Sequence, residues 1–491
     1  MSLSDNSFVL KNDGTLWGCG YNAYGHLGLG DTTSRKTFTQ ITTNVDDIKS
    51  VYCGGEHTFI LKNDGTLWGC GYNAYNELGL EDKTERHIFT KITTNADDVK
   101  SVYCGYYHTF ILKNDGTLWG CGDSYQGKLG LGEDIGNITT TFTQITTNTD
   151  NIKSIYCGYY HTFILKNDGT LWGCGANGSS QLGLEDTNYR TTFTIIGNNP
   201  GNIKSVCCGG WHTFILQNDG TLWGCGSNTN GQLGLGDTKS RNIFTKIITD
   251  IKSVYCGNEY TIILKNDGTL WGCGSNSYGQ LGLGDTNDRN TFTQITTNTD
   301  DIKLVYCGYS HTIILKNDGT LWGCGLNTSG QLGLGNTTNK KLFTQIITNT
   351  DNIKCFANDY PALPSIIKFY DTTIGHIETL DTNNFRNISI NTVEKLKSLC
   401  VKPKDTFLSC LISFDKKQTW KAFDGTNWNT ISNISPENII LNGMEVDNLN
   451  KLDKNKLISG GFIGDLDFKI AMKTNDTSKT PSVTKIYIEY K

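Results

Sequence analysis

Residues 57–71 of this chain read HTFILKNDGTLWGCG, and this stretch decides the fold. Residues 57–62 are rich in Thr, Phe and Ile, which is typical of a β-strand. Residues 63–65, Asn-Asp-Gly, predict a tight turn, because Asn-Gly and Asp-Gly steps tolerate positive φ. Residues 66–71 predict the strand that returns from this turn. The stretch is therefore expected to form a β-hairpin.

The same unit recurs along the chain. Before the hairpin, IKSVYCG at 48–54 predicts another strand, and a Gly- and Asn-rich loop after it leads to a short fourth strand around 89–92. A period of about fifty residues with four strands in each unit is typical of a β-propeller. Seven copies predict an all-β fold with a seven-bladed β-propeller. The string NDGTLWGCG begins at Asn12, Asn63, Asn114, Asn167, Asn218, Asn266 and Asn317.

The phase of the copies predicts how the ring closes. The first hairpin lacks the strand that precedes every later hairpin, whereas the last such strand, at 353–358, has no hairpin after it. Pairing of residues 353–358 with the N-terminal strands would complete one four-stranded blade. It would also remove two open sheet edges.

These copies resemble the RCC1 repeat, the regulator of chromosome condensation type, over about residues 6–358. Its pattern is Gly-x-x-His, then Asp-Gly, then Gly-x-Asn-x-x-Gly-Gln-Leu-Gly. One copy matches with Gly308, His311, Asp318-Gly319, Asn327 and Gly330-Gln331-Leu332-Gly333. The departures are His26, Glu77 and Lys128 at the Gln, Asn76 and Ser180 at a loop Gly, and Tyr260 at a His.

The resemblance implies the propeller fold but not the nucleotide exchange for which the family is best known. Exchange factors of this kind use a wedge inserted into the ring, and the near-constant spacing of these copies leaves no room for such an insertion. Fold alone does not supply function.

Composition divides the chain into three parts. Residues 1–358 form the repeat array, and residues 359–365 contain two of the six prolines and predict a stiff linker. Residues 366–491 predict a smaller, mostly antiparallel β module, a sandwich with short helices near 392–399 and after Ser435. The segment SFDKKQTWKAFDGTNW within it resembles small β modules in tail and surface proteins of Gram-positive bacteria and their phages.

Charge and hydropathy exclude several classes of function. The formal net charge is −5, and acidic residues outnumber basic ones in the array, so no nucleic-acid partner is expected. No stretch approaches about 18 consecutive apolar residues, so no membrane insertion is expected. The start of the chain lacks the pattern of a signal peptide. We therefore expect a protein that is cytoplasmic as synthesised, with a phage-like particle or cell surface as a further setting.

The repeated cysteines and histidines predict structural roles. Free Cys behaves as a small buried hydrophobe, so we expect these side chains between the blades, with disulfides between strands left as an alternative. One Cys and one His in each blade cannot supply the four ligands of zinc, and a hydrogen bond from each His to a neighbouring loop is expected instead. No catalytic pair or phosphate-binding loop stands out. We predict no metal, no cofactor and no enzyme activity. The histidines are His57, His108, His161, His212 and His311.

One face of the ring is expected to vary between blades. Loops after the first and third strands of each blade share this face, and Tyr and Trp in them offer large contact area at low entropy cost. Packing between loops is the alternative role for these side chains. We predict a non-enzymatic protein that binds a glycan or protein receptor, as a phage-tail-like or bacterial surface component. The alternative is an intracellular regulator or effector that docks on a GTPase or other host protein. The candidate residues are Tyr21, Tyr24, Tyr72, Tyr75, Tyr106, Tyr107, Tyr125, Tyr159, Tyr160, Trp211, Tyr278 and Tyr309.

Overall fold

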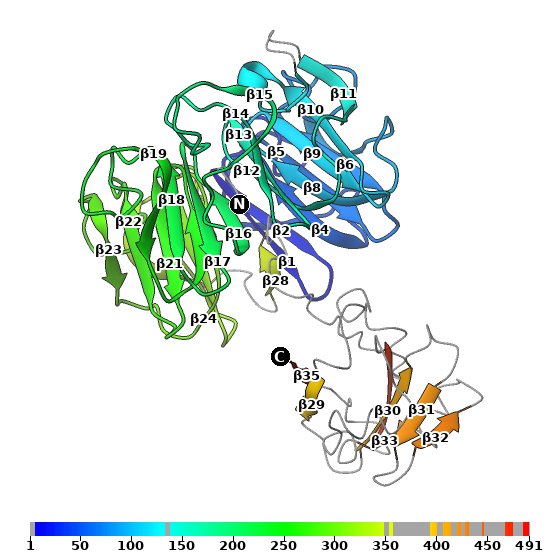
Figure 1. The fold of residues 1–491 in the computed structure, drawn as a ribbon. Helices are drawn as coiled ribbons and strands as arrows, with labels where there is room; N and C mark the ends of the chain where they lie inside the picture. The colour runs from blue at the N-terminus through cyan, green and yellow to red at the C-terminus, as the bar shows by residue number, and fades with distance from the viewer. Residues whose placement is uncertain are drawn as a thin grey trace. The chain divides into compact units, whose positions relative to one another are not determined.

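The computed structural model describes residues 5–132, 138–347 and 353–356, and seven strands between Val393 and Tyr490. The chain forms two compact units, Met1–Tyr360 and Pro361–Lys491. The first unit consists of seven four-stranded antiparallel sheets (Figure 1). Each sheet is one blade, and its strands A to D follow one another from one edge of the sheet to the other.

The strand bounds repeat from blade to blade. Blade 1 contains β28 (Ile353–Phe356), β1 (Asn6–Lys11), β2 (Leu16–Gly20) and β3 (Arg35–Ile41). Blade 2 contains β4 (Ile48–Cys53), β5 (His57–Lys62), β6 (Leu67–Gly71) and β7 (Arg86–Lys91). Blade 3 contains β8 (Val99–Cys104), β9 (His108–Lys113), β10 (Leu118–Asp123) and β11 (Ile138–Ile145), with a short 3-10 turn, η1 (Tyr125–Gly127), before β11. Blade 4 contains β12 (Ile152–Cys157), β13 (His161–Lys166), β14 (Leu171–Gly175) and β15 (Arg190–Ile195). Blade 5 contains β16 (Ile203–Cys208), β17 (His212–Gln217), β18 (Leu222–Gly226) and β19 (Arg241–Ile248). Blade 6 contains β20 (Ile251–Cys256), β21 (Tyr260–Lys265), β22 (Leu270–Gly274) and β23 (Arg289–Ile295). Blade 7 contains β24 (Ile302–Cys307), β25 (His311–Lys316), β26 (Leu321–Gly325) and β27 (Lys340–Ile346).

The Asn-Asp-Gly turn between strands B and C satisfies its own polar groups. Gly65 has a φ of 84°, which a residue with a Cβ rarely adopts. The carboxylate of Asp64 accepts hydrogen bonds from the backbone N–H of Thr66 at 2.9 Å and from its hydroxyl at 2.7 Å. The same hydroxyl accepts a hydrogen bond from the indole of Trp68 at 3.0 Å. The turn therefore locks the start of strand C as well as the hairpin.

The two ends of the array share one blade, as the sequence predicts. Strand β28 lies beside β1 (Figure 1) and pairs with it antiparallel. In this pairing Val9 lies opposite Phe356. Both side chains belong to a buried cluster that also contains Tyr306 of blade 7. Six further buried clusters join the other neighbouring blades, so apolar packing continues around the whole ring. The ring is closed.

The cysteines lie between the blades, which confirms their predicted place. The fourteen ring cysteines whose side chains the structure describes are buried and free, so no disulfide joins any two of them. Burial raises the pKa of the Cys19 thiol well above its usual range, so this thiol stays neutral. Cys207 and Cys256 come closest, with 3.1 Å between their sulfur atoms.

The repeated histidines link five of the blades to the next blade, which confirms their structural role, but each binds a strand residue and not the neighbouring loop that the sequence predicts. Nε2 of His57 hydrogen-bonds the hydroxyl of Thr109 in blade 3 at 2.9 Å, and both side chains are fully buried. The Gly of the Gly-x-x-His pattern makes room for the ring, because a Cβ on Gly54 would lie 2.2 Å from Cε1 of His57. The last of these hydrogen bonds joins blade 7 to blade 1, where the ring closes: Nε2 of His311 lies 3.0 Å from the hydroxyl of Ser7.

The second unit contains two sheets among its described residues. They are built from β29 (Val393–Leu399), β30 (Thr406–Ser413), β31 (Trp420–Phe423), β32 (Trp428–Ile431), β33 (Met444–Glu445), β34 (Asp467–Thr474) and β35 (Lys485–Tyr490). All pairs are antiparallel, as predicted, and β31 and β32 form a hairpin. The helix predicted near 392–399 is wrong, because β29 occupies these residues and pairs with β35. The helix predicted after Ser435 lies outside the described residues, and the sandwich stays a prediction.

Candidate functional site

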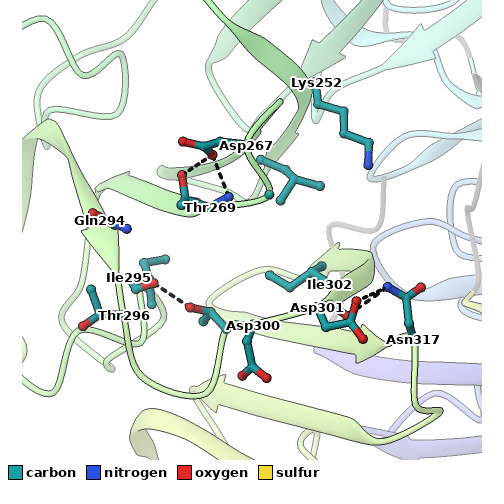
Figure 2. Close-up of a pocket in the computed structure, with 13 residues that line it drawn as sticks. Lys252, Asp267, Thr269, Gln294, Ile295, Thr296, Asp300, Asp301, Ile302 and Asn317 are labelled. Atoms are coloured by element: carbon teal, nitrogen blue, oxygen red, sulfur yellow. Dashed lines mark hydrogen bonds between the residues drawn. The ribbon is translucent and has the colours of Figure 1, made fainter.

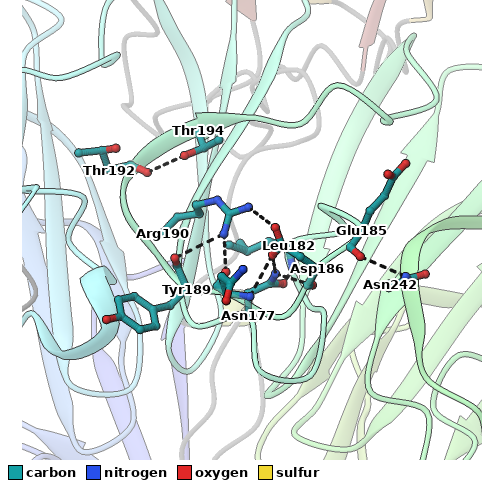
Figure 3. A network of polar contacts seen from close by, with 10 residues as sticks. Asn177, Leu182, Glu185, Asp186, Tyr189, Arg190, Thr192, Thr194 and Asn242 are labelled. Carbon is teal, nitrogen blue, oxygen red and sulfur yellow. Dashed lines mark hydrogen bonds and ion pairs between the residues drawn. The ribbon is translucent and has the colours of Figure 1, made fainter.

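In six of the seven blades one asparagine holds the loop between strands C and D, whereas blade 3 has Ser124 at this position. In blade 4 the side-chain amide of Asn177 donates to the carbonyl of Asp186 at 2.8 Å and accepts from the N–H of Leu182 at 2.9 Å (Figure 3). Arg190 closes the same loop through an ion pair with Asp186 at 2.6 Å. This network explains the Asn of the Gly-x-Asn pattern. It holds the loop internally and leaves other positions free to vary.

The residue directly before strand B of each blade lies at the same point; in six blades it belongs to the loop between strands A and B, and in blade 1 it precedes β1. Its backbone carbonyl accepts a hydrogen bond of 2.7–2.9 Å from the backbone N–H at the end of strand C of the same blade. The A strands of neighbouring blades contact each other, so these loops lie nearest the ring axis. We call these seven residues the rim positions. They are Asp5, Glu56, Tyr107, Tyr160, Trp211, Glu259 and Ser310.

Ten of the twelve aromatic side chains proposed from the sequence touch one another on this face. Consecutive ring centroids lie 4.4–6.1 Å apart, which is the range of favourable aromatic pairs. We call this set the aromatic row. Its members are Tyr21, Tyr24, Tyr72, Tyr75, Tyr106, Tyr107, Tyr159, Tyr160, Trp211 and Tyr309.

The aromatic row crosses the ring axis. The rings of Tyr159 in blade 4 and Tyr309 in blade 7 lie 5.9 Å apart, although these blades are not neighbours. Tyr159 is only 5% exposed, so packing accounts for its position. The other members keep part of their surface open. Tyr125 and Tyr278 are 56% and 43% exposed and stand outside the row.

A buried cation supports one end of the row. Lys128 is fully buried, forms an ion pair with Asp123, and places its ammonium 4.8 Å from the ring centre of Tyr160. Burial lowers the pKa of Lys128, and Asp123 opposes this change. The lysine occupies the position at which the repeat has Gln. This departure from the pattern therefore places a cation beneath the aromatic face, next to Tyr160.

A second departure buries an acid. Glu77 also replaces the Gln, is fully buried, and accepts the N–H of Tyr75 at 3.0 Å through Oε2. Its Oε1 has no hydrogen-bond partner among the described residues. Burial raises the pKa of Glu77 to about 8, so this carboxyl is mostly protonated at neutral pH.

The opposite face carries a cavity whose three acidic side chains already have partners. This cavity of about 630 Å³ lies between blades 6 and 7 (Figure 2). In it Asp267 accepts hydrogen bonds from Thr269, and Asp301 accepts one from Asn317 at 2.5 Å. Asp300 pairs with Lys316 at 2.7 Å. We therefore place the candidate site on the aromatic face.

Comparison with known proteins identifies the class. A family model described as the RCC1-like domain matches residues 87–360, which is more than half of the chain. Two matches to the regulator of chromosome condensation repeat cover residues 13–61 and 48–77. The chain belongs to the RCC1-repeat family.

Individual relatives share the propeller. The chain is 33% identical over 239 residues to the ultraviolet-B receptor UVR8 of Arabidopsis thaliana, covering 48% of this chain and 54% of the receptor. It is 27% identical over 249 residues to the probable E3 ubiquitin-protein ligase HERC6 of Homo sapiens, covering 48% of this chain and 24% of the ligase. It is 24% identical over 279 residues to the X-linked retinitis pigmentosa GTPase regulator homolog of Caenorhabditis elegans, covering 48% of this chain and 20% of the regulator homolog. The chain thus spans about half the length of these relatives, or less.

A solved structure shows the same fold. Prp20p of Saccharomyces cerevisiae superposes with a TM-score of 0.63 at 20% identity, over 70% of this chain and 88% of that one. At this identity the likeness concerns the fold alone.

The comparisons correct the prediction that the protein is not an enzyme. That prediction rested on the lack of a catalytic constellation in the repeats, but a relative that shares this propeller is named as an E3 ubiquitin-protein ligase. A ring without catalytic residues therefore does not exclude an enzyme. Among the described residues, no group of three His, Cys, Asp or Glu side chains could hold a metal ion, and no helix could span a membrane.

Sequence reasoning missed the acidic rim positions. The site predicted from the sequence consists of aromatic loop residues only and does not include Asp5, Glu56 and Glu259. An alignment of the seven copies on the residue before His57, Tyr260 and their equivalents would have found Glu56 and Glu259.

Proposed function

We propose that the propeller is a protein-docking module of a regulatory protein, with the aromatic row as its docking surface. The observation that carries this proposal is the continuity of ten aromatic side chains from six blades across one face. Protein interfaces are enriched in Tyr and Trp at their centres. The NDG turns on the opposite face repeat with little change and offer a partner fewer distinguishing features.

Relatives support a protein partner. One similar protein is named as a GTPase regulator homolog and another as a receptor. A GTPase is therefore the first partner class to test. The proposal keeps residues 1–358 as the docking module, 359–365 as a linker and 366–491 as a separate module.

Two narrower hypotheses from the sequence receive no support from these relatives. A glycan ligand and a phage-tail or bacterial surface setting rest on the aromatic loops and on the C-terminal segment alone. The named relatives are plant and animal proteins. A glycan array on the full chain remains a useful second arm of the test.

The test removes three half-buried members of the aromatic row. The full chain and its Tyr107→Ala, Tyr160→Ala, Trp211→Ala triple variant serve as bait, with Asp64→Ala on the opposite face as the control. We expect the wild type and the control to capture the same proteins, and we expect the triple variant not to capture them. Each such protein is then purified and titrated, and we expect binding at least about 100-fold weaker for the triple variant.

Thermal melting of the same variants checks that the surface is dispensable for folding. We expect the triple variant to melt within about 5 °C of the wild type, because each of these side chains is partly exposed. Equal binding by the triple variant and the wild type would contradict the proposal. Loss of the cooperative melting transition would contradict it too, because the row would then be core.

A further inference from the structure

The seven rim positions divide into two arcs. Three consecutive blades, 3 to 5, present Tyr107, Tyr160 and Trp211 there. The remaining blades, 6, 7, 1 and 2, present an acidic arc, in which three of four residues are carboxylic acids. The acidic arc consists of Glu259, Ser310, Asp5 and Glu56.

The arginines of this face are already paired elsewhere. Five loops between strands C and D each hold an Arg–Asp ion pair of 2.5–2.8 Å, formed four residues apart in the same loop. The buried ammonium of Lys128 is paired with Asp123. No ion pair among the described residues involves Asp5, Glu56 or Glu259. The acidic arc is therefore uncompensated within the described part of the ring.

Two carboxylates of the arc, those of Glu56 and Asp5, lie close enough to repel each other. Glu56 is half-buried, and its pKa is raised to about 7 by burial and by the nearby charges of Asp5 and Glu85. Burial likewise raises the pKa of Asp5 to about 6, and the side chain of Gln331 opposes this change. A cation close to Glu56 and Asp5 would relieve the repulsion between their carboxylates.

Aromatic rings adjoin the acidic arc. The backbone carbonyl of Glu56 accepts a hydrogen bond from the N–H of Tyr72 at 2.9 Å, so Glu56 is anchored directly to a member of the aromatic row. Its charge also contributes to the raised pKa values of Tyr72, Tyr106 and Tyr107. An aromatic face attracts a Lys or Arg cation, and a neighbouring carboxylate adds an ion pair. This combination discriminates against anionic and neutral ligands.

We propose that the rim binds a segment of a partner protein that carries arginine or lysine side chains, with the acidic arc receiving the cation. The aromatic arc then packs against the apolar stem of that side chain or its neighbours. This inference rests on the proposed docking function and specifies the chemistry of the partner.

The first test uses a matched pair of peptides on the full chain. An acetylated (Arg-Gly)4 peptide is titrated calorimetrically against the same peptide with citrulline at each Arg, which keeps the shape and removes the charge. We expect the Arg peptide to bind at least about tenfold more tightly and to weaken as salt is raised. Equal affinity of the two peptides would overturn the inference. Arginine amide alone binding as tightly as the peptide would overturn it as well, because the site would then serve a small molecule.

The second test removes the charges of the arc. The Glu56→Gln, Glu259→Gln double variant keeps the side-chain shape, and we expect it to bind the Arg peptide at least about tenfold more weakly. Glu185→Gln, an exposed change in a loop between strands C and D of the same face, is the control and should leave affinity unchanged. Equal weakening by the control would contradict a local acidic site.

The outcomes separate this inference from the docking proposal. A captured protein that is lost from the aromatic triple variant but binds the double Gln variant normally would leave the docking surface intact and overturn the cationic partner. A different result would support the acidic arc alone. In that case Arg-peptide binding depends on Glu56 and Glu259, but all captured proteins bind the aromatic triple variant as tightly as the wild type. That result would contradict the docking role of the aromatic row.

Discussion

The two faces of the ring use the same repeat in opposite ways. On the face of the NDG turns, each Asp binds the Thr two residues later, and four lysines pair with an Asp sixteen residues earlier. On the aromatic face, the rim positions share only a backbone hydrogen bond. Their side chains differ from blade to blade.

This difference teaches where a repeat leaves room for function. When the structural contact is made by a side chain, as in the NDG turns, all copies need the same residue. When the backbone carbonyl makes the contact, as at Glu56 and Tyr107, the side chain is released from the fold and can be adapted to a partner.

The largest predicted effect concerns the buried histidines, which belong to the repeated part. Burial lowers the pKa of His57, His161, His212 and His311 from 6.5 to about 3. Their contribution to stability is therefore complete above pH 6.5 and is lost as the pH falls toward 3. We expect each to cost about 1 kcal/mol of the free energy of unfolding for every pH unit below 6.5. The raised pKa values of Asp5, Glu56 and Glu77 offset part of this loss. Thermal melting at pH 7 and pH 4.5 measures the net change.

The chain offers a matched control for this prediction. Blade 6 already holds Tyr260 at the histidine position, where its hydroxyl donates to the carbonyl of His311 at 2.5 Å. His161→Tyr should therefore fold and should lose about 1 kcal/mol less per pH unit below 6.5 than the wild type. Identical pH profiles of the variant and the wild type would show that His161 is not held neutral by the fold.

The next prediction tests whether the glycine of the Gly-x-x-His pattern is needed to make room for the histidine imidazole. A Cβ on Gly158 would lie 2.2 Å from Cε1 of His161, so Gly158→Ala forces buried groups apart. We expect a loss of about 3 kcal/mol in the free energy of unfolding, measured by chemical denaturation. Gly178→Ala in the same blade is the control, because a Cβ there meets nothing within 4 Å. Similar losses in both variants would refute the steric explanation.

Much of the ring could be predicted because its pattern is local and repeated. The strand expected at 48–54 is β4, Ile48–Cys53, and the pairing expected of 353–358 is made by β28 with β1. The segment at 392–399 was misassigned because Val393, Leu396 and Leu399 recur every three residues, a spacing that favours a helix. Its backbone pairs with β35 about ninety residues later, and such long-range pairing overrides local propensity.

The candidate site was less predictable because it depends on equivalence in space. The contact between Tyr159 and Tyr309 exists only once the ring has closed and brought blades 4 and 7 face to face. The acidic arc likewise joins Glu259 to Asp5 across the junction of the two chain ends. Neither relation is visible in the spacing of residues along the chain.

The smallest effect tests whether a departure from the repeat costs stability on the aromatic face. Glu77 stands where blade 4 has Gln181, and both accept one backbone N–H in the same way. The folded pKa of Glu77 is raised from 4.5 to about 8, so its contribution to stability is complete below pH 4.5 and is lost as the pH rises toward 8. We expect Glu77→Gln to be about 2 kcal/mol more stable relative to the wild type at pH 6 than at pH 4.5.

The reciprocal variant Gln181→Glu should acquire the same pH dependence in blade 4, and denaturant titrations of both variants at the two pH values measure it. If Glu77→Gln shows no pH-dependent gain in the free energy of unfolding, a partner stabilises the ionised carboxylate of Glu77. The replacement of Gln by Glu would then not destabilise the fold. If the gain appears, the chain tolerates a destabilising acid at the edge of the aromatic row. Selection for stability alone does not retain such a residue, so the gain would favour a role for this edge in binding.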